Sequence, residues 1–398
     1  MRTILHIDMN SYFATAEQQA SPLLRGRPVG IIKAEGRGCV IAASVEAKKF
    51  GVKTGVTVWE ARRLCPRITL VPADMDKYLA LTRRLVKIVQ DYSPTVEVFS
   101  IDEMFAEVTD SQKNFAGGAW QMALEMKWRI KQELGEWMRA SVGIAFTKLI
   151  AKLASEMRKP DGLTWLTPED YLERTAAVKV EEVCGIGRSR SAFLHGLGVT
   201  TLGEARLRQL PPEIAELVWL REEEPVAEIE KLEPAKSVSR TFTTFTEITK
   251  QEGIKKLVRN LVEEAAAKLR EMDMAGRTMW LSLSADRYEE SSWVRLTIPA
   301  PTNDPLTIFT LLWKEYEKKP VGGVRFAGTG ISNLEFKVQS SIFSNREDLL
   351  KAADAVNGKY GLFTVYPATL LGGELIRPEV TGYLGDKWYR FGTNQSHQ

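Results

Sequence analysis

The stretch VFSIDEMFAEV at residues 98–108 decides how this chain folds. Apolar residues flank two adjacent carboxylates, Asp102 and Glu103, and this pattern predicts a β-hairpin with both acids at its tight turn. Carboxylates held so close repel each other, and one raises the pKa of the other unless a cation lies between them. The usual cation is Mg²⁺, which takes hard oxygen ligands and shares them with phosphate groups. A solvated acidic turn is the alternative interpretation of this stretch by itself.

The N-terminal stretch ILHIDMNSYF at residues 4–13 supplies a third carboxylate. It reads as an apolar strand that ends at Asp8 and passes into a helix pattern over residues 14–19. A core strand that delivers Asp8 beside the hairpin would bring three carboxylates together with the backbone carbonyl of Met9, and such a set can hold two Mg²⁺ ions. Two ions of this kind activate an attacking hydroxyl and stabilise the leaving group of a phosphoryl displacement.

Together these stretches resemble the Y-family translesion DNA polymerases, most closely the bacterial polymerase IV and UmuC-like branches, over residues 1–340. The family pattern is an Asp that ends the first strand, two adjacent aromatics, and Ser-Ile-Asp-Glu on a later hairpin. Here these are Asp8, Tyr12 with Phe13, and residues 100–103. The resemblance implies a DNA-directed DNA polymerase that adds deoxynucleotides to a primer 3′-hydroxyl, past damaged bases and without proofreading. It implies catalytic carboxylates and metal ligands for two Mg²⁺ ions at Asp8, Asp102 and Glu103, with the Met9 carbonyl as a further ligand.

Nucleotide binding is expected from Ser11, Tyr12, Phe13, Lys48 and Lys159. The first three would cradle the phosphates, and Phe13 would be the steric gate that excludes a ribose 2′-hydroxyl. The family carries Tyr and Arg at the positions of Val45 and Lys48, and Lys48 can meet a phosphate only as a point charge. Lys159 follows a helix expected over residues 146–158, and its charge would offset negative charge on the β- and γ-phosphates. The family's second acidic position is Asn10 here, and it is not the principal metal ligand.

Two further segments are expected to meet DNA. The strand over residues 38–43 carries Cys39 and Ile41, which would cover the nascent base pair. Residues 183–190 (VCGIGRSR) resemble a helix-hairpin-helix. Gly185 and Gly187 would let its turn approach a phosphate, and the helix that begins at Arg188 would offer free N–H groups to it. A plain helical hairpin is the alternative for this segment.

Composition bounds the class of protein. The 398 residues are 44% hydrophobic and 26% charged, which is typical of a soluble, multidomain globular protein. No run of 18 apolar residues and no signal-peptide pattern is present, so we expect no membrane span and a cytoplasmic location. Cys39, Cys65 and Cys184 show no metal-ligand spacing and fit reduced thiols. The net charge of +3 is only mildly basic, so the expectation of DNA binding rests on the motifs.

The predicted fold class is α+β multidomain, a right-hand polymerase with palm, fingers, a helical thumb and a βαββαβ little finger. The expected boundaries are residues 1–10 and 75–164 for the palm, 11–74 for the fingers, 165–232 for the thumb, 233–237 for a linker, 238–340 for the little finger and 341–398 for the tail.

The expected partners are primer–template DNA, deoxynucleoside triphosphates and a sliding clamp, and the chain is expected to be a monomer. Residues 339–343 (QSSIF) resemble the short peptides that bind the bacterial clamp, with Gln339, Ile342 and Phe343 as anchors. A plain linker is the alternative there. Two other functions stay open: a palm-fold nucleotide cyclase, and a weakly active or inactive DNA-binding relative. The DNA-binding segments argue against the cyclase, and the three carboxylates argue against the inactive relative.

Overall fold

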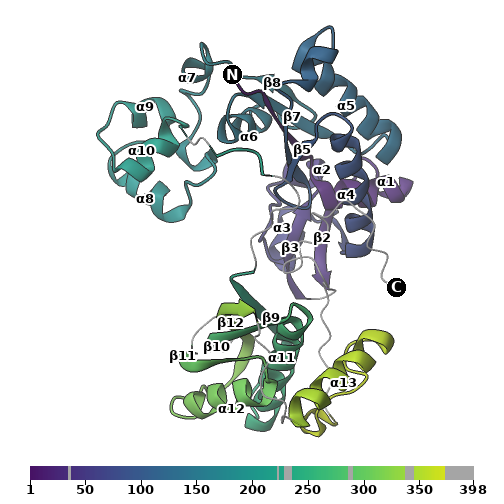
Figure 1. Cartoon of the computed structure of the whole chain (residues 1–398), viewed down its shortest axis with the longest axis vertical. Coiled ribbons are helices and arrows are strands. Elements are labelled where there is room, and N and C mark those ends of the chain that lie inside the picture. Colours follow the sequence, from purple (N-terminus) through teal and green to yellow (C-terminus); the bar gives the residue numbers. More distant parts are fainter. Residues whose placement is uncertain (35–36, 222–223, 228–234, 286–289, 337–344, 373–398) are drawn as a thin grey trace. The chain divides into compact units, whose positions relative to one another are not determined.

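The computed structural model describes residues 1–34, 37–221, 224–227, 235–285, 290–336 and 345–372. These form two compact units, one before and one after residues 228–234 (Figure 1). No helix among the described residues is long and apolar enough to cross a lipid bilayer.

A five-stranded sheet with the strand order β5-β6-β1-β7-β8 organises the first unit. Its central strand β1 (Ile4–Met9) is buried at every residue, as expected for an apolar run between two neighbours. It pairs antiparallel with β6 (Glu103–Glu107) and with β7 (Ala140–Ala145). The outer strands are β5 (Thr95–Val98), antiparallel to β6, and β8 (Leu163–Trp165), parallel to β7. Strand β8 reaches one residue past the boundary expected at 164.

Helices pack on this sheet and include α4 (Met75–Gln90), α5 (Gly118–Leu134) and α6 (Lys148–Glu156). Helix α6 approaches β7 closely, because a Cβ atom added to Gly143 would lie 2.0 Å from the Ala151 carbonyl oxygen. Since Gly143 faces His6 in register, α6 covers the face of the sheet that carries the even-numbered residues of β1. Asp8 lies on the same face of the sheet.

A smaller three-stranded sheet with the order β3-β2-β4 lies within residues 12–72. Its elements are α1 (Tyr12–Ala20), a short 3₁₀ helix (Pro22–Leu24), β2 (Val29–Ala34), β3 (Arg37–Ala43), α2 (Val45–Lys48), α3 (Val58–Leu64) and β4 (Thr69–Pro72). The sequence pattern predicts a helix over residues 45–50, and α2 is shorter because it ends at Lys48. Helix α3 and strand β4 were not predicted, and β4 completes the sheet by pairing parallel with β2.

Short helices follow the five-stranded sheet: α7 (Tyr171–Arg174), a 3₁₀ turn (Val180–Glu182), α8 (Arg188–Gly196), α9 (Leu202–Arg206) and α10 (Pro212–Val218). They share an apolar core with α6, in which Leu149 and Leu153 meet Leu194 and Leu202. A capping box between Thr201 and Glu204 begins α9. The predicted helical character of this segment is therefore confirmed.

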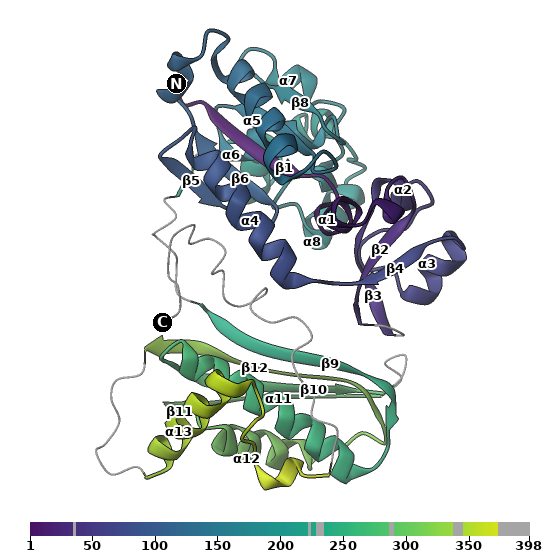
Figure 2. The same ribbon diagram turned by 90° about the vertical axis from the view of Figure 1, so that its right-hand side faces the viewer.

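The second unit has the predicted βαββαβ order. It comprises β9 (Ser237–Ile248), α11 (Gln251–Glu271), β10 (Met274–Ser284), β11 (Ser291–Thr302), α12 (Pro305–Tyr316) and β12 (Val324–Phe336). The strands form an antiparallel sheet in the order β11-β10-β12-β9, and both helices share one core with a single face of it (Figure 2). Strand β9 begins one residue before the expected boundary at 238. Helix α13 (Asn345–Tyr360) is held to α11 by the ion pair between Arg270 and Asp354.

Candidate active site

The strand register brings Asp8 and Glu103 together. Asp8 of β1 faces Glu103 of β6 across the antiparallel pair, so their side chains project from the same face of the sheet as nearest neighbours. Glu103 is the first residue of β6, so its predicted place in the turn is wrong. The turn is residues 99–102, and the amides of Phe99 and Ser100 close it by donating to the Glu103 carbonyl at 3.0 and 3.1 Å.

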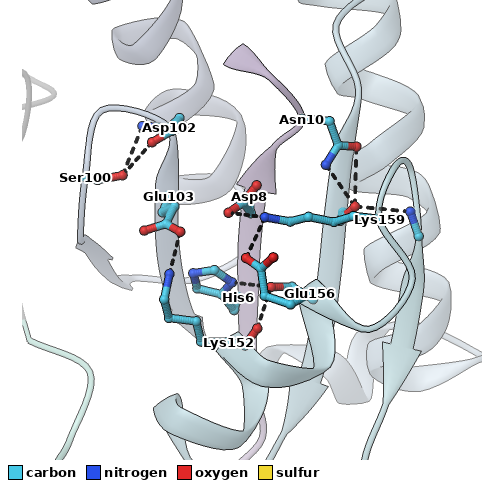
Figure 3. A network of polar contacts seen from close by, with 12 residues as sticks. His6, Asp8, Asn10, Ser100, Asp102, Glu103, Lys152, Glu156 and Lys159 are labelled. Atoms are coloured by element: carbon cyan, nitrogen blue, oxygen red, sulfur yellow. Dashed lines mark hydrogen bonds and ion pairs between the residues drawn. The ribbon is translucent and has the colours of Figure 1, made fainter. Parts of the chain in front are cut away.

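Asp102 ends this turn beside β1. The Met9 amide donates to the Asp102 carbonyl at 3.0 Å, which continues the β1–β6 ladder by one step. The Asp102 carboxylate accepts a hydrogen bond of 2.6 Å from the Ser100 hydroxyl (Figure 3). Burial raises the pKa of Asp102, while the Ser100 hydrogen bond opposes the rise. The turn therefore presents Asp102 next to Met9, as the sequence suggested for two metal ligands.

A carboxylate that the sequence analysis missed completes a compact acidic group. Among the described residues, carboxylate oxygens of Asp8, Glu103 and Glu156 lie within 4.8 Å of one another, and Asp102 is outside that group. Glu156 is the last residue of α6. The sequence carried a signal for it, because Lys148, Lys152 and Glu156 follow one another at intervals of four along one helix face.

Lysine side chains neutralise this acidic group. Lys152 of α6 forms a close ion pair with Glu103. The Lys159 ammonium lies 2.8 Å from an Asp8 oxygen and 2.5 Å from a Glu156 oxygen, so it bridges the two acids (Figure 3). The sequence predicted Lys159 as a phosphate ligand, and the structure places it on the carboxylates themselves.

The pKa values of the two facing carboxylates shift in opposite directions. Burial raises the pKa of Asp8, Lys159 offsets part of that rise, and the neighbouring Glu103 adds to it. Burial also opposes ionisation of Glu103, but the hydrogen bond with Asp8 and the Lys152 ammonium together lower its pKa. A hard divalent cation would relieve this repulsion, and the all-oxygen donor set fits such an ion.

A neutral histidine lies under the acidic group. His6 is fully buried two residues before Asp8, with its Nδ1 atom 2.8 Å from the Ser155 hydroxyl and its ring against Phe105. Burial and the nearby Lys152 lower the pKa of His6 to about 3. His6 therefore packs β1 against α6 without adding charge.

The two predicted aromatics begin α1 beside the carboxylates and pack on α4. The Phe13 ring stacks on the Tyr78 ring with centroids 4.3 Å apart. The Tyr12 hydroxyl donates to the Tyr78 carbonyl at 2.7 Å and contacts the Thr82 hydroxyl at 2.9 Å. Ser11, just before them, adopts the left-handed conformation with φ of 49°, which turns the chain from β1 into α1.

Helix α2 carries Lys48 close enough to the same acids for their charges to act on it. Lys48 is exposed at the surface, although its ammonium is partly desolvated by nearby protein atoms. Partial burial and the Lys159 ammonium lower the pKa of Lys48, while Asp8, Glu156 and Asp102 act to raise it. Cys39 and Ile41 lie on β3 and are half-buried. The backbone of Cys39 forms an isolated antiparallel β-bridge with that of Thr57. The Ile41 carbonyl accepts a hydrogen bond of 3.3 Å from the Thr54 hydroxyl.

The glycine turn lies before α8. Gly185 has φ of +93°, and a Cβ atom there would come within 2.9 Å of Leu217, so this tight turn needs glycine. Gly187 caps α8, which starts at Arg188 with an exposed first turn. Gln339, Ile342 and Phe343 lie outside the described residues.

Comparison with known proteins identifies the family of this chain. Residues 7–156 match the model of the impB/mucB/samB family, and residues 235–342 match the model of its C-terminal domain. The chain belongs to the impB/mucB/samB family. It is a homologue of DNA polymerase IV, a Y-family DNA polymerase, which confirms the family predicted from residues 8–13 and 100–103.

Curated relatives match this family member over nearly their whole length. DNA polymerase IV of Moorella thermoacetica is 33% identical over 396 residues, covering 93% of this chain and 96% of that protein. DNA polymerase IV 1 of Bacillus subtilis is 29% identical and covers 97% of each chain. A solved Y-family DNA polymerase chimera matches with a TM-score of 0.70 at 21% identity, over 84% of this chain and all of that one. The predicted right-hand polymerase fold is therefore confirmed.

Proposed function

We propose that this translesion-type DNA polymerase extends a primer 3′-hydroxyl through two Mg²⁺ ions held at the β1–β6 edge. The observation that carries the proposal is the register that places Asp8 opposite Glu103 and Met9 opposite Asp102. In this proposal Asp8, Asp102, Glu103 and the Met9 carbonyl supply the ligands. Bound Mg²⁺ would lower the pKa of the attacking hydroxyl and offset charge on the leaving pyrophosphate.

In this proposal, the parts of the chain correspond to the subdomains of a right-hand polymerase. The five-stranded sheet with its helices serves as the palm, residues 11–74 as the fingers and residues 165–232 as the thumb. The second unit serves as the little finger. Its substrates would be primer–template DNA and deoxynucleoside triphosphates, with the chain acting as a monomer.

Lysines and aromatics would bind the nucleotide beside the carboxylates. Lys159 contacts the acidic group directly, so it would reach a triphosphate bound to the same cations, and Lys48 would add a second positive charge near them. Ser11 and Tyr12 would border the phosphates, Phe13 the sugar, and Cys39 and Ile41 the nascent base pair. The turn from Gly185 to Arg188 would bind a DNA phosphate through backbone amides.

Primer extension on a primed template with Mg²⁺ tests this function. We expect Asp102→Ala and Glu103→Ala each to abolish extension while DNA binding stays close to that of the parent, because each loses a metal ligand. Glu107→Ala is the matched control, since Glu107 lies on the same strand but pairs with Ile4 at its far end. Substantial extension by either of the first two variants contradicts the metal assignment.

The same assay separates the alternatives. A nucleotide cyclase would convert a nucleoside triphosphate without primer or template, and an inactive relative would bind DNA without extending it. The residues Gln339, Ile342 and Phe343 would add one further partner, a sliding clamp bound through a short peptide.

A further inference from the structure

The turn that carries Lys159 is folded tightly against the end of α6. A Cβ atom added to Gly162 would lie 2.1 Å from the Arg158 carbonyl oxygen, so the turn closes back on α6 with no room for a side chain. Asp161 adopts the left-handed conformation with φ of 58°. A backbone in this conformation persists only where its surroundings hold it.

Asn10, which directly follows strand β1, holds this turn. Its Oδ1 atom accepts a hydrogen bond of 2.6 Å from the Asp161 amide, and its Nδ2 atom donates to the Ser141 hydroxyl at 3.0 Å. The Gly162 amide donates to the same Ser141 oxygen at 3.2 Å. A backbone amide can only donate, so Oδ1 must face Asp161 and the side-chain orientation follows. Asn10 and Ser141 are buried, so loss of either partner leaves a buried donor unpaired.

Helix α5 holds the turn from the other side. The Lys127 ammonium donates to the carbonyls of Asp161 and Gly162 at 2.5 and 2.9 Å, and Lys131 donates to the Asp161 carboxylate at 2.8 Å. The backbone from Asp161 to Gly162 is therefore fixed to β7, to α5 and to Asn10 at the end of β1. Lys159, two residues earlier, keeps a long side chain whose ammonium rests on Asp8 and Glu156. Its reach toward the carboxylates is set by where the turn is anchored.

We propose that Asn10 is a positioning residue that acts through Lys159. It ties the end of β1, the strand that carries Asp8, to the turn that carries the lysine, and so sets the Lys159 ammonium against the acidic group and any triphosphate bound there. The inference rests on the proposed role of Lys159 in nucleotide binding. An acidic residue at position 10 could accept the Asp161 amide and the Ser141 hydroxyl, so the anchor needs an acceptor oxygen facing Asp161 rather than an amide as such.

A double-mutant cycle on single-nucleotide primer extension tests the proposal. We expect Asn10→Ala to lower kcat/KM about tenfold and Lys159→Met to lower it at least as much. The double variant should be no worse than Lys159→Met, because Asn10 has nothing left to position. Effects that multiply in the double variant overturn the proposal. If Lys159→Met extends primers like the parent, the proposed role of Lys159 fails, and a loss in Asn10→Ala would then have to act by another route.

Two further variants separate positioning from general stability. Asn10→Asp keeps the acceptor and should restore most of kcat/KM, and an Asp variant as poor as the Ala variant overturns the proposal. Ser141→Ala removes the other half of the anchor and leaves Asn10 in place. It should lower kcat/KM in the parent and not in the Lys159→Met background, which keeps the test available if Asn10→Ala does not fold.

Discussion

At the residue scale, paired opposite charges make the site possible. Three carboxylates, one each from β1, β6 and α6, lie together, and Lys152 and Lys159 form ion pairs with them. Removing one member of a buried charge pair leaves the other charge uncompensated. The resulting loss of folding stability is larger than the net stability that the pair contributes. Each acid and each lysine therefore depends on its partner, and a substitution at one alters the ionisation of the others.

His6 makes folding stability depend on pH. Its pKa is lowered to about 3, whereas in the unfolded chain it titrates near about 6.5. Between these values only the unfolded state takes up the proton, so the free energy of unfolding falls as the pH drops from about 6.5, by up to about 1.4 kcal/mol per unit. We expect His6→Asn to lose this dependence in urea denaturation at pH 5 and pH 7. Equal pH dependence in variant and parent would contradict the assignment.

Phe13 is expected to govern sugar selection. We predict that Phe13→Ala incorporates ribonucleotides far better than the parent, because the ring would no longer fill the space of the 2′-hydroxyl. Tyr12→Ala is the comparison. It loses the hydrogen bonds to Tyr78 and Thr82, so its effect should be a loss of stability of about 1–3 kcal/mol. If Tyr12→Ala relaxes sugar selection in primer extension and Phe13→Ala does not, the steric gate is Tyr12.

At the element scale, the contact between α6 and β7 decides the geometry of the site. Helix α6 carries Lys152 and Glu156, and it can approach β1 only because Gly143 of β7 has no side chain. Gly143→Ala should therefore shift α6, lower the free energy of unfolding by about 1–3 kcal/mol and reduce primer extension.

The control for this variant is Gly196→Ala in α8. A Cβ atom at Gly196 meets nothing within 4 Å, so this change should keep or raise the melting temperature. A Gly143→Ala protein as stable and as active as the parent would show that α6 can adjust without cost.

At the scale of the whole molecule, two units with separate cores are joined in one chain. The second unit has its own core, in which Leu261, Leu281 and Tyr316 are buried. The family model for the C-terminal domain begins at residue 235, close to the start of this unit.

Clamp binding is a prediction for the full chain. Ile342 and Phe343 would fill an apolar pocket of the clamp while Gln339 occupies a small polar site, and each lost anchor should cost about 2 kcal/mol. The double change Ile342→Ala with Phe343→Ala should leave distributive primer extension unchanged and remove its stimulation by added clamp. A lower melting temperature with clamp stimulation retained would show that these side chains pack on the chain itself.

Local patterns in the sequence determined the family and most of the fold. The apolar run that ends at Asp8 and the hairpin that leads into Glu103 are short-range features, because a buried strand and a tight turn each depend on a few neighbouring residues. The βαββαβ order of the second unit was predicted from alternating periodicities for the same reason. Helix α3 and strand β4 were missed, since seven and four residues carry too little pattern. Strand β4 is stabilised by its pairing with β2, which lies far from it in the sequence.

Only the tertiary structure decided which side chains share the site. Glu156 joins Asp8 because α6 packs on Gly143, and Lys159 meets both acids because its turn is anchored to Asn10, 151 residues before Asp161. No local signal links residues so far apart, because their contact depends on how a helix docks on a sheet. The sequence alone identified the chemistry of the site as carboxylates with nearby lysines. The packing of α6 and the anchored turn decided which carboxylate faces which lysine.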